Sequence, residues 1–268
     1  GYEAQAKINW DQLAESTAIL VRFLDNVVTW NEDLNALEKQ RIAASETRRL
    51  GVGIMGVADM LNQLGVSYDS KEGIDIITRV MEFITNAAYQ ASASLAGEKG
   101  ASPIYSEDEY MECPFIEAAL SQETQTFIRE NGIRNIAIMS IAPTGSISNI
   151  IKGFQIDNKN YIGVSGGVEP IFALYYTRRT ESFKKTEFYK IFHSTVQAYI
   201  DKMNLQEEID SNEKMADALP DYFHRTAHHI NPDKRVIIQG KIQKYIDHSI
   251  SSTINLPEDV QPEVISDI

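Results

Sequence analysis

The sequence predicts a helix-rich α/β domain that spans residues 1–268 as one unit. Apolar residues recur at helical spacing through several long segments. One short and mostly apolar run, 136–141, is typical of a strand buried on both faces, and a turn of small polar residues follows it directly. The chain has no internal repeat, low-complexity tract or obvious linker, so a single domain is the simplest interpretation.

The same periodicity gives the order of the elements. Helices are expected at 10–28, 47–64, 70–95, 115–130, 186–203 and 232–247. Asn9 and Ser70 are the expected N-caps of the first and third helices. Strands are expected at 136–141 and 250–256, and 170–178 is either a strand or a strand–helix join. Residues 152–163 are polar and are expected to form an exposed excursion.

Charge and cysteine content narrow the classes of partner. The chain has 25 basic and 38 acidic residues, a net charge of −13, which disfavours a nucleic-acid partner. Its apolar runs are far shorter than the ~20 residues of a membrane span, and no signal peptide is evident. The single cysteine, Cys113, cannot form an internal disulfide. These features favour a reducing, cytoplasmic compartment.

The turn after the 136–141 strand is the main candidate site. Its glycine lets the backbone approach a ligand closely, and its hydroxyls and successive N–H groups suit a di- or triphosphate. A helix starting near Ser148 would point its positive end at the same place. The alternative is an ordinary strand-to-helix turn capped by serine. The candidate substrate-binding residues are Ala142, Pro143, Thr144, Gly145, Ser146, Ile147 and Ser148.

A second glycine pattern, Gly51–Gly56, spells G-x-G-x-x-G. A dinucleotide fingerprint needs a strand before it, whereas the residues preceding Gly51 are charged and helical in character. We therefore interpret these glycines as allowing a helix to pack closely against a neighbour.

Three further features have ordinary explanations. His224 and His228 are four apart, but Arg225 stands where a metalloprotease has glutamate, and no third ligand is evident. No metal site is therefore expected. Acidic neighbours disfavour a thiolate at Cys113, which we interpret as structural or incidental. Tyr175 and Tyr176 would point to opposite faces of a strand, so packing is the favoured role.

Four segments, in order along the chain, resemble the large catalytic chain of ribonucleotide reductase. Residues 47–61 resemble the family's R-R-x-G-x-G-x-x-G-x-A-D segment, and 141–148 are similar to its substrate-phosphate loop. Residues 165–173 resemble its S-G-I-E-P-x-F-A segment, and 243–257 its late Q-x-x-x-D-x-x-x-S-x-T-x-N-L-P strand. The P-T-G-S-I-S and E-P-I-F-A forms are most similar to the adenosylcobalamin-dependent class.

The resemblance implies part of a ten-stranded α/β barrel around a finger loop. In that family a finger-loop cysteine becomes a thiyl radical that abstracts the ribose 3′-hydrogen, and other cysteines supply reducing equivalents. The resemblance begins after the finger loop and stops before the last strand, and Cys113 matches none of those cysteines. Residues 152–163 also make the link after the phosphate loop longer than is usual in the family.

The resulting hypothesis is a fragment or split subunit of a ribonucleoside di- or triphosphate reductase, inactive alone. It would supply the phosphate-binding loop, and another chain would carry the finger-loop cysteine. Adenosylcobalamin is implied only by the resemblance. The alternatives are a non-catalytic nucleotide-binding or assembly partner of a complete reductase, and an unrelated phosphate-binding α/β enzyme. Open strand edges and an apolar inner face would favour a complex or a homo-oligomer.

Overall fold

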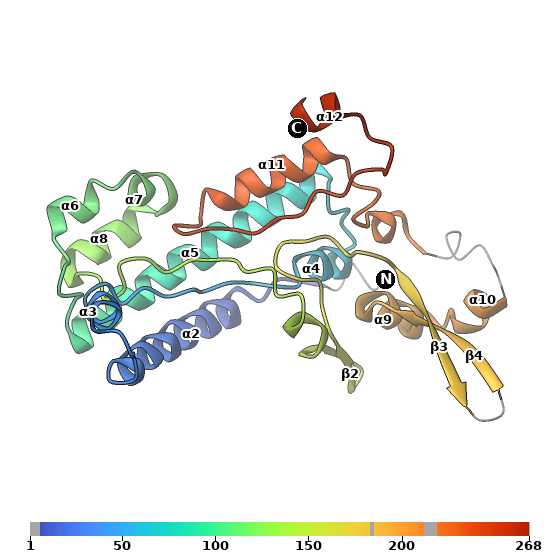
Figure 1. The fold of residues 1–268 in the computed structure, drawn as a ribbon, viewed down its shortest axis with the longest axis horizontal. Coiled ribbons are helices and arrows are strands. Elements are labelled where there is room, and N and C mark those ends of the chain that lie inside the picture. Colours follow the sequence, from blue (N-terminus) through green and yellow to red (C-terminus); the bar gives the residue numbers. More distant parts are fainter. Residues whose placement is uncertain (1–5, 183–184, 212–218, 268) are drawn as a thin grey trace.

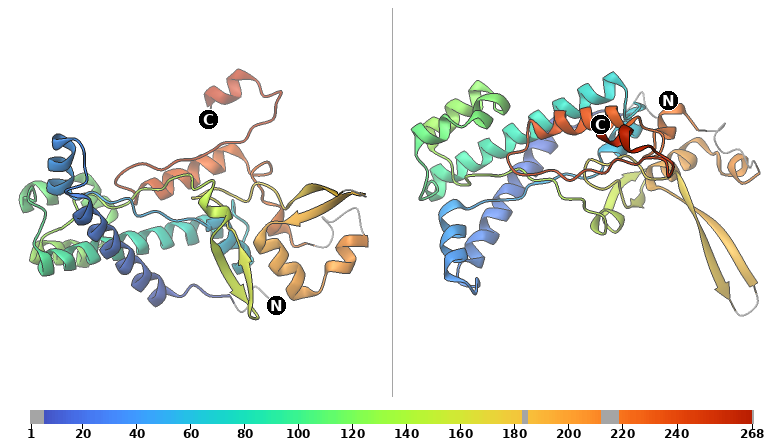
Figure 2. Two further views of the ribbon diagram at one scale, coloured as in Figure 1. Left: turned by 60° about the horizontal axis from the view of Figure 1, so that its bottom comes forward. Right: turned by 45° about the horizontal axis from the view of Figure 1, so that its top comes forward.

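A computed structural model describes residues 6–182, 185–211 and 219–267. Three extended segments run side by side through the middle of the molecule, with helices on either side of them (Figure 1). The longest helix, α5 (Lys71–Lys99), contacts α2 (Trp10–Asn31), α8 (Gln122–Asn131) and α11 (Pro232–Gln243). A long hairpin projects from the opposite end to α8, as both further views show (Figure 2).

The two long helices begin at the predicted caps. Asn9 Oδ1 accepts a hydrogen bond from Gln12 N at 3.1 Å, and Ser70 Oγ accepts one from Gly73 N at 3.0 Å. These bonds satisfy amides that have no partner within the helix. Both helices continue a few residues beyond their predicted ends.

The extended segments form an open, parallel arc held by two isolated β-bridges and not by a continuous strand ladder. Val52 is bridged in parallel to Met139, and Ile141 is bridged in parallel to Ile250. The predicted 136–141 strand therefore lies in the centre, between residues 50–53 and 248–251. Among the described residues no further strand pairs with either outer segment. The parallel α/β arrangement is confirmed, but the arc does not close into a barrel.

The predicted helix at 47–64 is wrong in its first half. Arg48 has left-handed backbone (φ 48°), and the chain then runs extended as far as Gly56, where α4 (Val57–Leu64) begins. Leu50 N and Val52 N donate to Ala137 O and Ile138 O at 2.9 and 2.8 Å. Pairing with the central strand thus overrides local helical character.

Shorter helices fill the polar regions and divide one predicted helix. They are α3 (Glu38–Thr47), α6 (Glu107–Met111) and α7 (Pro114–Ala119). The predicted helix at 115–130 breaks at Ser121, whose Oγ accepts from Thr124 N at 3.2 Å and so begins α8.

Two antiparallel hairpins follow the central strand. The excursion at 152–163 is β1 (Lys152–Ile156) paired with β2 (Lys159–Ile162) through Asp157 and Asn158, both with positive φ. The projecting hairpin is β3 (Tyr175–Ser182) paired with β4 (Lys185–Phe192). The predicted helix at 186–203 is therefore wrong before α9 (Ser194–Met203), because residues 186–192 pair with β3 as part of β4.

The C-terminal region is helical and irregular. It contains α10 (Gln206–Ser211), a 3-10 helix (Asp221–His224), α11 and α12 (Pro262–Asp267). Of the predicted strand at 250–256, only Ile250 takes part in a bridge. Ser251 N still donates to Ile141 O at 3.1 Å, and beyond Ser251 the described residues have no further backbone pairing with the central segment.

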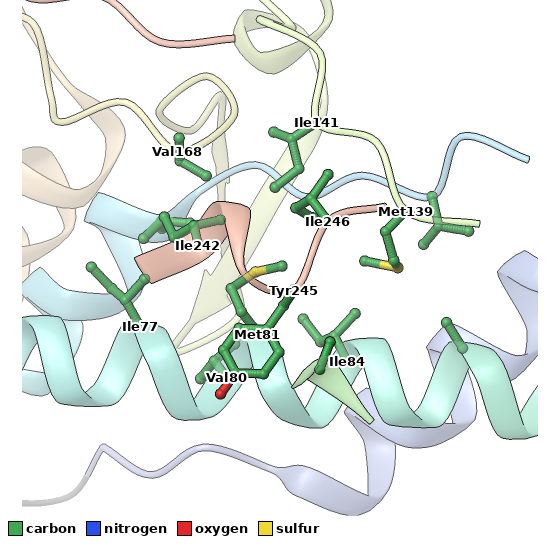
Figure 3. Close-up of a cluster of buried hydrophobic side chains, with 14 of the residues drawn as sticks. Ile77, Val80, Met81, Ile84, Met139, Ile141, Val168, Ile242, Tyr245 and Ile246 are labelled. Atoms are coloured by element: carbon green, nitrogen blue, oxygen red, sulfur yellow. The ribbon is translucent and has the colours of Figure 1, made fainter. Parts of the chain in front are cut away.

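The main core lies between α5, the central strand and α11 (Figure 3). Met81, Met139 and Ile242 are fully buried there. A smaller cluster around Val196, Ile200 and Phe223 supports α9 and the base of the long hairpin. The core therefore fixes the central strand, from which the candidate loop emerges.

Candidate phosphate-binding site

The candidate loop, Ala142–Ser148, leaves the carboxyl end of the central strand. Asp247 holds that strand by accepting hydrogen bonds from Ile138 N at 2.7 Å and Met139 N at 2.8 Å. The hydroxyl of buried Tyr89 donates to the same carboxylate. A strand fixed in this way gives the loop a rigid starting point.

The loop makes a tight turn with its own hydrogen bonds. Thr144 has left-handed backbone (φ 52°), and its carbonyl accepts from Ser148 N at 2.9 Å. Asn149 Nδ2 donates to Gly145 O at 2.6 Å. The expected helix near Ser148 is only a 3-10 turn, Ile147–Asn149, so a helix macrodipole contributes little here.

A glycine pair forms the floor beneath the loop. A Cβ at Gly166 would lie 2.7 Å from Pro143 O, and one at Gly167 would lie 2.9 Å from Ala142 O. Gly167 N also donates to Thr144 Oγ1 at 2.8 Å. Only glycine lets these two backbones approach so closely.

A buried carboxylate on α4 holds the floor in place. Asp59 Oδ2 accepts from Ser165 N at 2.6 Å, and the hydroxyl of Thr195 donates to the other oxygen. His193 Nδ1 lies 3.5 Å from Asp59 Oδ1. Burial lowers the pKa of His193, and the nearby carboxylate only partly opposes that effect, so the ring is neutral near pH 7.

The tip of the loop is exposed and has backbone amides without a described partner. Gly145, Ser146 and Ile147 are exposed, and a Cβ at Gly145 would meet nothing within 4 Å. The amides of residues 144–147 donate to no acceptor among the described residues. Successive free amides in a turn form a concavity suited to an anion. Ser148 instead is 3% exposed and lies beneath the loop.

A second carboxylate links two of the sequence motifs. Glu169 Oε2 accepts from Arg235 Nη2 at 3.0 Å, and its other oxygen accepts from Thr253 N at 2.9 Å. Glu169, which follows the glycine floor, is thereby joined to α11 through Arg235 and to the chain after residues 248–251 through Thr253. Sequence reasoning named neither Asp59 nor the two glycines as site residues, although all three lie within the quoted motifs.

The other candidate groups have structural neighbours. Within the described ranges no group of three metal-ligating side chains occurs. His228 packs edge-on against Phe172, and His229 Nδ1 is 2.8 Å from Thr226 Oγ1. Tyr175 packs on Phe192, and Cys113 is exposed. No helix in the described part of the chain is long and apolar enough to cross a bilayer.

Comparison with known proteins gives one family. The model of the ribonucleotide reductase barrel domain matches residues 2–268. A vitamin B12-dependent ribonucleoside-diphosphate reductase of Mycobacterium tuberculosis is 30% identical over 262 residues, covering 95% of this chain and 33% of that protein. The corresponding Thermoplasma acidophilum protein is 30% identical over 273 residues, covering 97% and 31%.

A solved structure shares the fold. The alpha subunit of the Actinobacillus ureae class Id ribonucleotide reductase superposes with a TM-score of 0.67 and 20% identity, covering 94% of this chain and 42% of that one. The chain spans about a third of the length of the curated relatives named above. Because the family model matches nearly the whole chain, the chain belongs to the ribonucleotide reductase family and forms part of the barrel domain.

Proposed function

We propose that this chain provides the substrate-phosphate clamp of a ribonucleoside di- or triphosphate reductase, which makes deoxyribonucleotides for DNA replication by radical chemistry. The observation that carries the proposal is the turn at 144–147, whose four amides donate to no acceptor in the described part of the chain and which follows the anchored central segment. The substrate-binding residues proposed are Ala142–Ser148. We also propose that the chain is one domain and acts in the cytoplasm.

The loop would bind phosphate mainly through its backbone. N–H groups directed at one point stabilise negative charge, and the anchored loop loses little freedom on binding. The hydroxyl of Ser146 is exposed and adds a donor. Ser148 would act indirectly, because its carbonyl accepts from Val164 N at 2.8 Å and supports the turn. Phosphate binding at this point would fix the ribose relative to the radical.

The radical itself would come from outside the described residues. Cys113, the only cysteine in the sequence, is exposed at the N-terminus of α7. It takes part in none of the described contacts of the loop or of the glycine floor. The proposed partner therefore carries the finger-loop cysteine. The open edges of the strand arc suit such a complex, or a homo-oligomer, because unpaired edges readily accept another strand.

Adenosylcobalamin is the cofactor proposed for the assembled reductase, following the vitamin B12-dependent relatives. The described residues do not fit it as a complete site. Two of the chain's cavities, of about 550 and 480 Å³, fall in the size range of sites for drug-sized ligands, and a cobalamin is much larger than such a ligand. We therefore assign it no residue in this chain.

A second candidate function is a non-catalytic nucleotide-binding or assembly partner of a complete reductase. The lack of a cysteine beside the loop favours it. Mixing the chain with the protein that carries the finger loop separates the two ideas. Reductase activity that requires this chain supports the clamp, and full activity of the other protein alone supports the assembly role.

Calorimetry tests the clamp directly. The chain should bind inorganic diphosphate more tightly than inorganic phosphate, and Ser146→Ala should weaken diphosphate binding by roughly 1.5–3 kcal/mol. Ser16→Ala, at an exposed serine on α2, is the matched control and should change nothing. With adenosylcobalamin and a dithiol but no partner, the chain should reduce no ribonucleotide. Turnover by the chain alone would refute the split-site proposal.

A further inference from the structure

A stripe of large apolar side chains runs along one side of α2 and continues around the corner into α3. Within α2 its members recur at three- and four-residue intervals, so they share one face of the helix. Their exposed fractions range from 36% to 75%. We call the following residues the α2 stripe: Ile19, Leu20, Phe23, Val27, Trp30, Leu34, Leu37 and Ile42.

The core of the chain does not use this face of α2. Thr17, Val21 and Asp25, which are buried, lie on the other side of the helix, and its main described neighbours are α5 and α3. In Figure 1 no described element lies below α2, and the right-hand view of Figure 2 shows α2 and α3 extending away from the other helices. A contiguous apolar face that the described residues leave in water indicates an interaction surface.

The exposed area of the stripe matches what a stable dimer needs. A large side chain offers roughly 150–250 Å² of surface, so eight of them at about half exposure leave on the order of 800 Å². One partner in an interface of standard size also contributes ~800 Å². The α2 stripe can therefore supply a whole interface without a second patch.

The stripe carries little charge, although the chain has a net charge of −13. In the described stretch from Ile19 to Trp30 the only exposed charged side chain is Arg22, which pairs with Glu98 at 2.6 Å. Asp25 in the same stretch is fully buried. Depletion of charge is typical of the centre of an interface. Two copies can therefore meet here without bringing their acidic groups together.

The order of side chains along α2 is self-complementary for an antiparallel pair. About a two-fold axis level with residue 25, position 19 of one copy faces position 30 of the other, and position 23 faces position 27. Ile19 would then oppose Trp30 of the second copy, and Phe23 would oppose Val27. Each contact joins a larger and a smaller apolar group. Such reciprocal contacts are what an isologous interface requires.

We propose that this chain forms a two-fold symmetric homodimer in which the α2 stripes of two copies pack antiparallel. The helices supply the interface, and the corner at Leu34, Leu37 and Ile42 extends it. The inference goes beyond the proposed function, because the interface uses neither the phosphate loop nor the open edges of the strand arc. Those edges stay free for another chain.

Sedimentation velocity over about 1–100 μM tests the dimer and gives its Kd. The unaltered chain should be dimeric at the upper end of this range. Trp30→Ala and Phe23→Ala should each raise the dimer Kd by at least about tenfold, because large aromatic side chains dominate interface energies and each change occurs twice in the dimer. Trp30 is 75% exposed and Phe23 is 60% exposed, so neither change should unfold the chain.

Two further variants separate the interface from general surface effects. Tyr176→Ala is the matched control, because it removes an aromatic ring that is 60% exposed in β3, outside the stripe, and it should leave the Kd unchanged. Phe23→Val combined with Val27→Phe should dimerise more tightly than Phe23→Val alone, because each opposed pair again holds one phenylalanine and one valine. Circular dichroism verifies that every variant is folded.

Spin labels measure the orientation of the two helices. In a Cys113→Ser background, labels are attached at Asn26→Cys or Glu15→Cys, both at exposed positions of α2. At 1.5 Å per residue, the two labels at position 15 of an antiparallel pair lie about 30 Å apart along the helices, whereas those at position 26 lie close to the axis. The distance at position 15 should therefore be much the longer.

Three results would overturn the proposal. They are a chain that stays monomeric up to about 100 μM, a dimer whose Kd neither Trp30→Ala nor Phe23→Ala changes, and similar label distances at positions 15 and 26. Binding of the finger-loop protein to a monomeric chain, lost in Trp30→Ala, would also overturn it and would assign the α2 stripe to that partner instead.

Discussion

Two glycine-bearing segments belong to neighbouring parallel extended segments, and their environments are opposite: the first pairs with the central segment, and the second follows its carboxyl end. In the Gly51–Gly56 segment, a Cβ at Gly53 would lie 2.6 Å from Ser140 O. In the Pro143–Ser148 loop, a Cβ at Gly145 would meet nothing within 4 Å. The first segment uses glycine to bring two backbones together. The second leaves space above a glycine where a ligand can approach.

The difference shows why a glycine pattern does not by itself identify a ligand site. The G-x-G-x-x-G segment does pack closely against a neighbour, as predicted, but it is extended over Gly51–Gly53 where a helix was expected. Its Val52 amide and carbonyl are both engaged by the central strand. The amides of loop residues 144–147, by contrast, have no acceptor within the described ranges. Free backbone donors, more than glycine, distinguish the candidate site.

Removing the anchor of the buried segment should have the largest effect. Arg48 is 4% exposed and donates to Asp25, which is fully buried. Arg48→Met should lower the free energy of unfolding by about 3 kcal/mol, because the carboxylate is left with fewer partners. Urea denaturation measures this. A loss below about 1 kcal/mol would show that Arg134, which also pairs with Asp25, is sufficient.

Filling the close contact should have the next largest effect. Gly53→Ala should destabilise the chain by about 1–3 kcal/mol through overlap with the Ser140 carbonyl. Gly51→Ala is the matched control in the same segment, since its nearest neighbour would be Ser140 Cβ at 3.9 Å. Equal urea midpoints for the two variants would contradict the close-packing explanation.

Lowering the pH should remove the stability that the charged carboxylate of Asp25 contributes to the fold. Burial alone would raise the pKa of this carboxyl, but hydrogen bonds from Arg134 and Arg48 outweigh burial and hold the pKa below its usual value. Its stabilising effect is therefore complete above about pH 4 and is lost as the pH falls through the lower folded-state pKa. The stability difference between the chain and Asp25→Asn should be constant from pH 7 to about 5 and shrink below about 4. A difference that shrinks above pH 5 would show the opposite pKa direction.

The exposed loop should tolerate a side chain best. Gly145→Ala should change the free energy of unfolding by no more than about 0.5 kcal/mol, because the added methyl group faces open space. The same denaturation series used for Gly53→Ala measures it. A loss as large as that of Gly53→Ala would remove the contrast between the two segments.

Much of the framework could be predicted from local patterns. Asn9 and Ser70 cap helices as expected, and the apolar run at 136–141 is the central extended segment, paired through isolated bridges at Met139 and Ile141. The loop that follows was found because it interrupts an apolar run with small polar residues. Its role as a phosphate site stays a prediction until ligand binding is measured. The β3–β4 hairpin was missed beyond its first strand because its pairing partners lie in a segment with helical spacing.

The sequence by itself determined the long helices that begin after Asn9 and Ser70, the course of the buried segment 136–141 and the start of its loop, because these depend on periodicity and capping between near neighbours. Only the tertiary structure decided that residues 50–53 are extended, that Gly166 and Gly167 form the floor, and that Asp59 holds it. Those features depend on backbone contacts between segments far apart in the chain. Local propensity carries no information about such contacts.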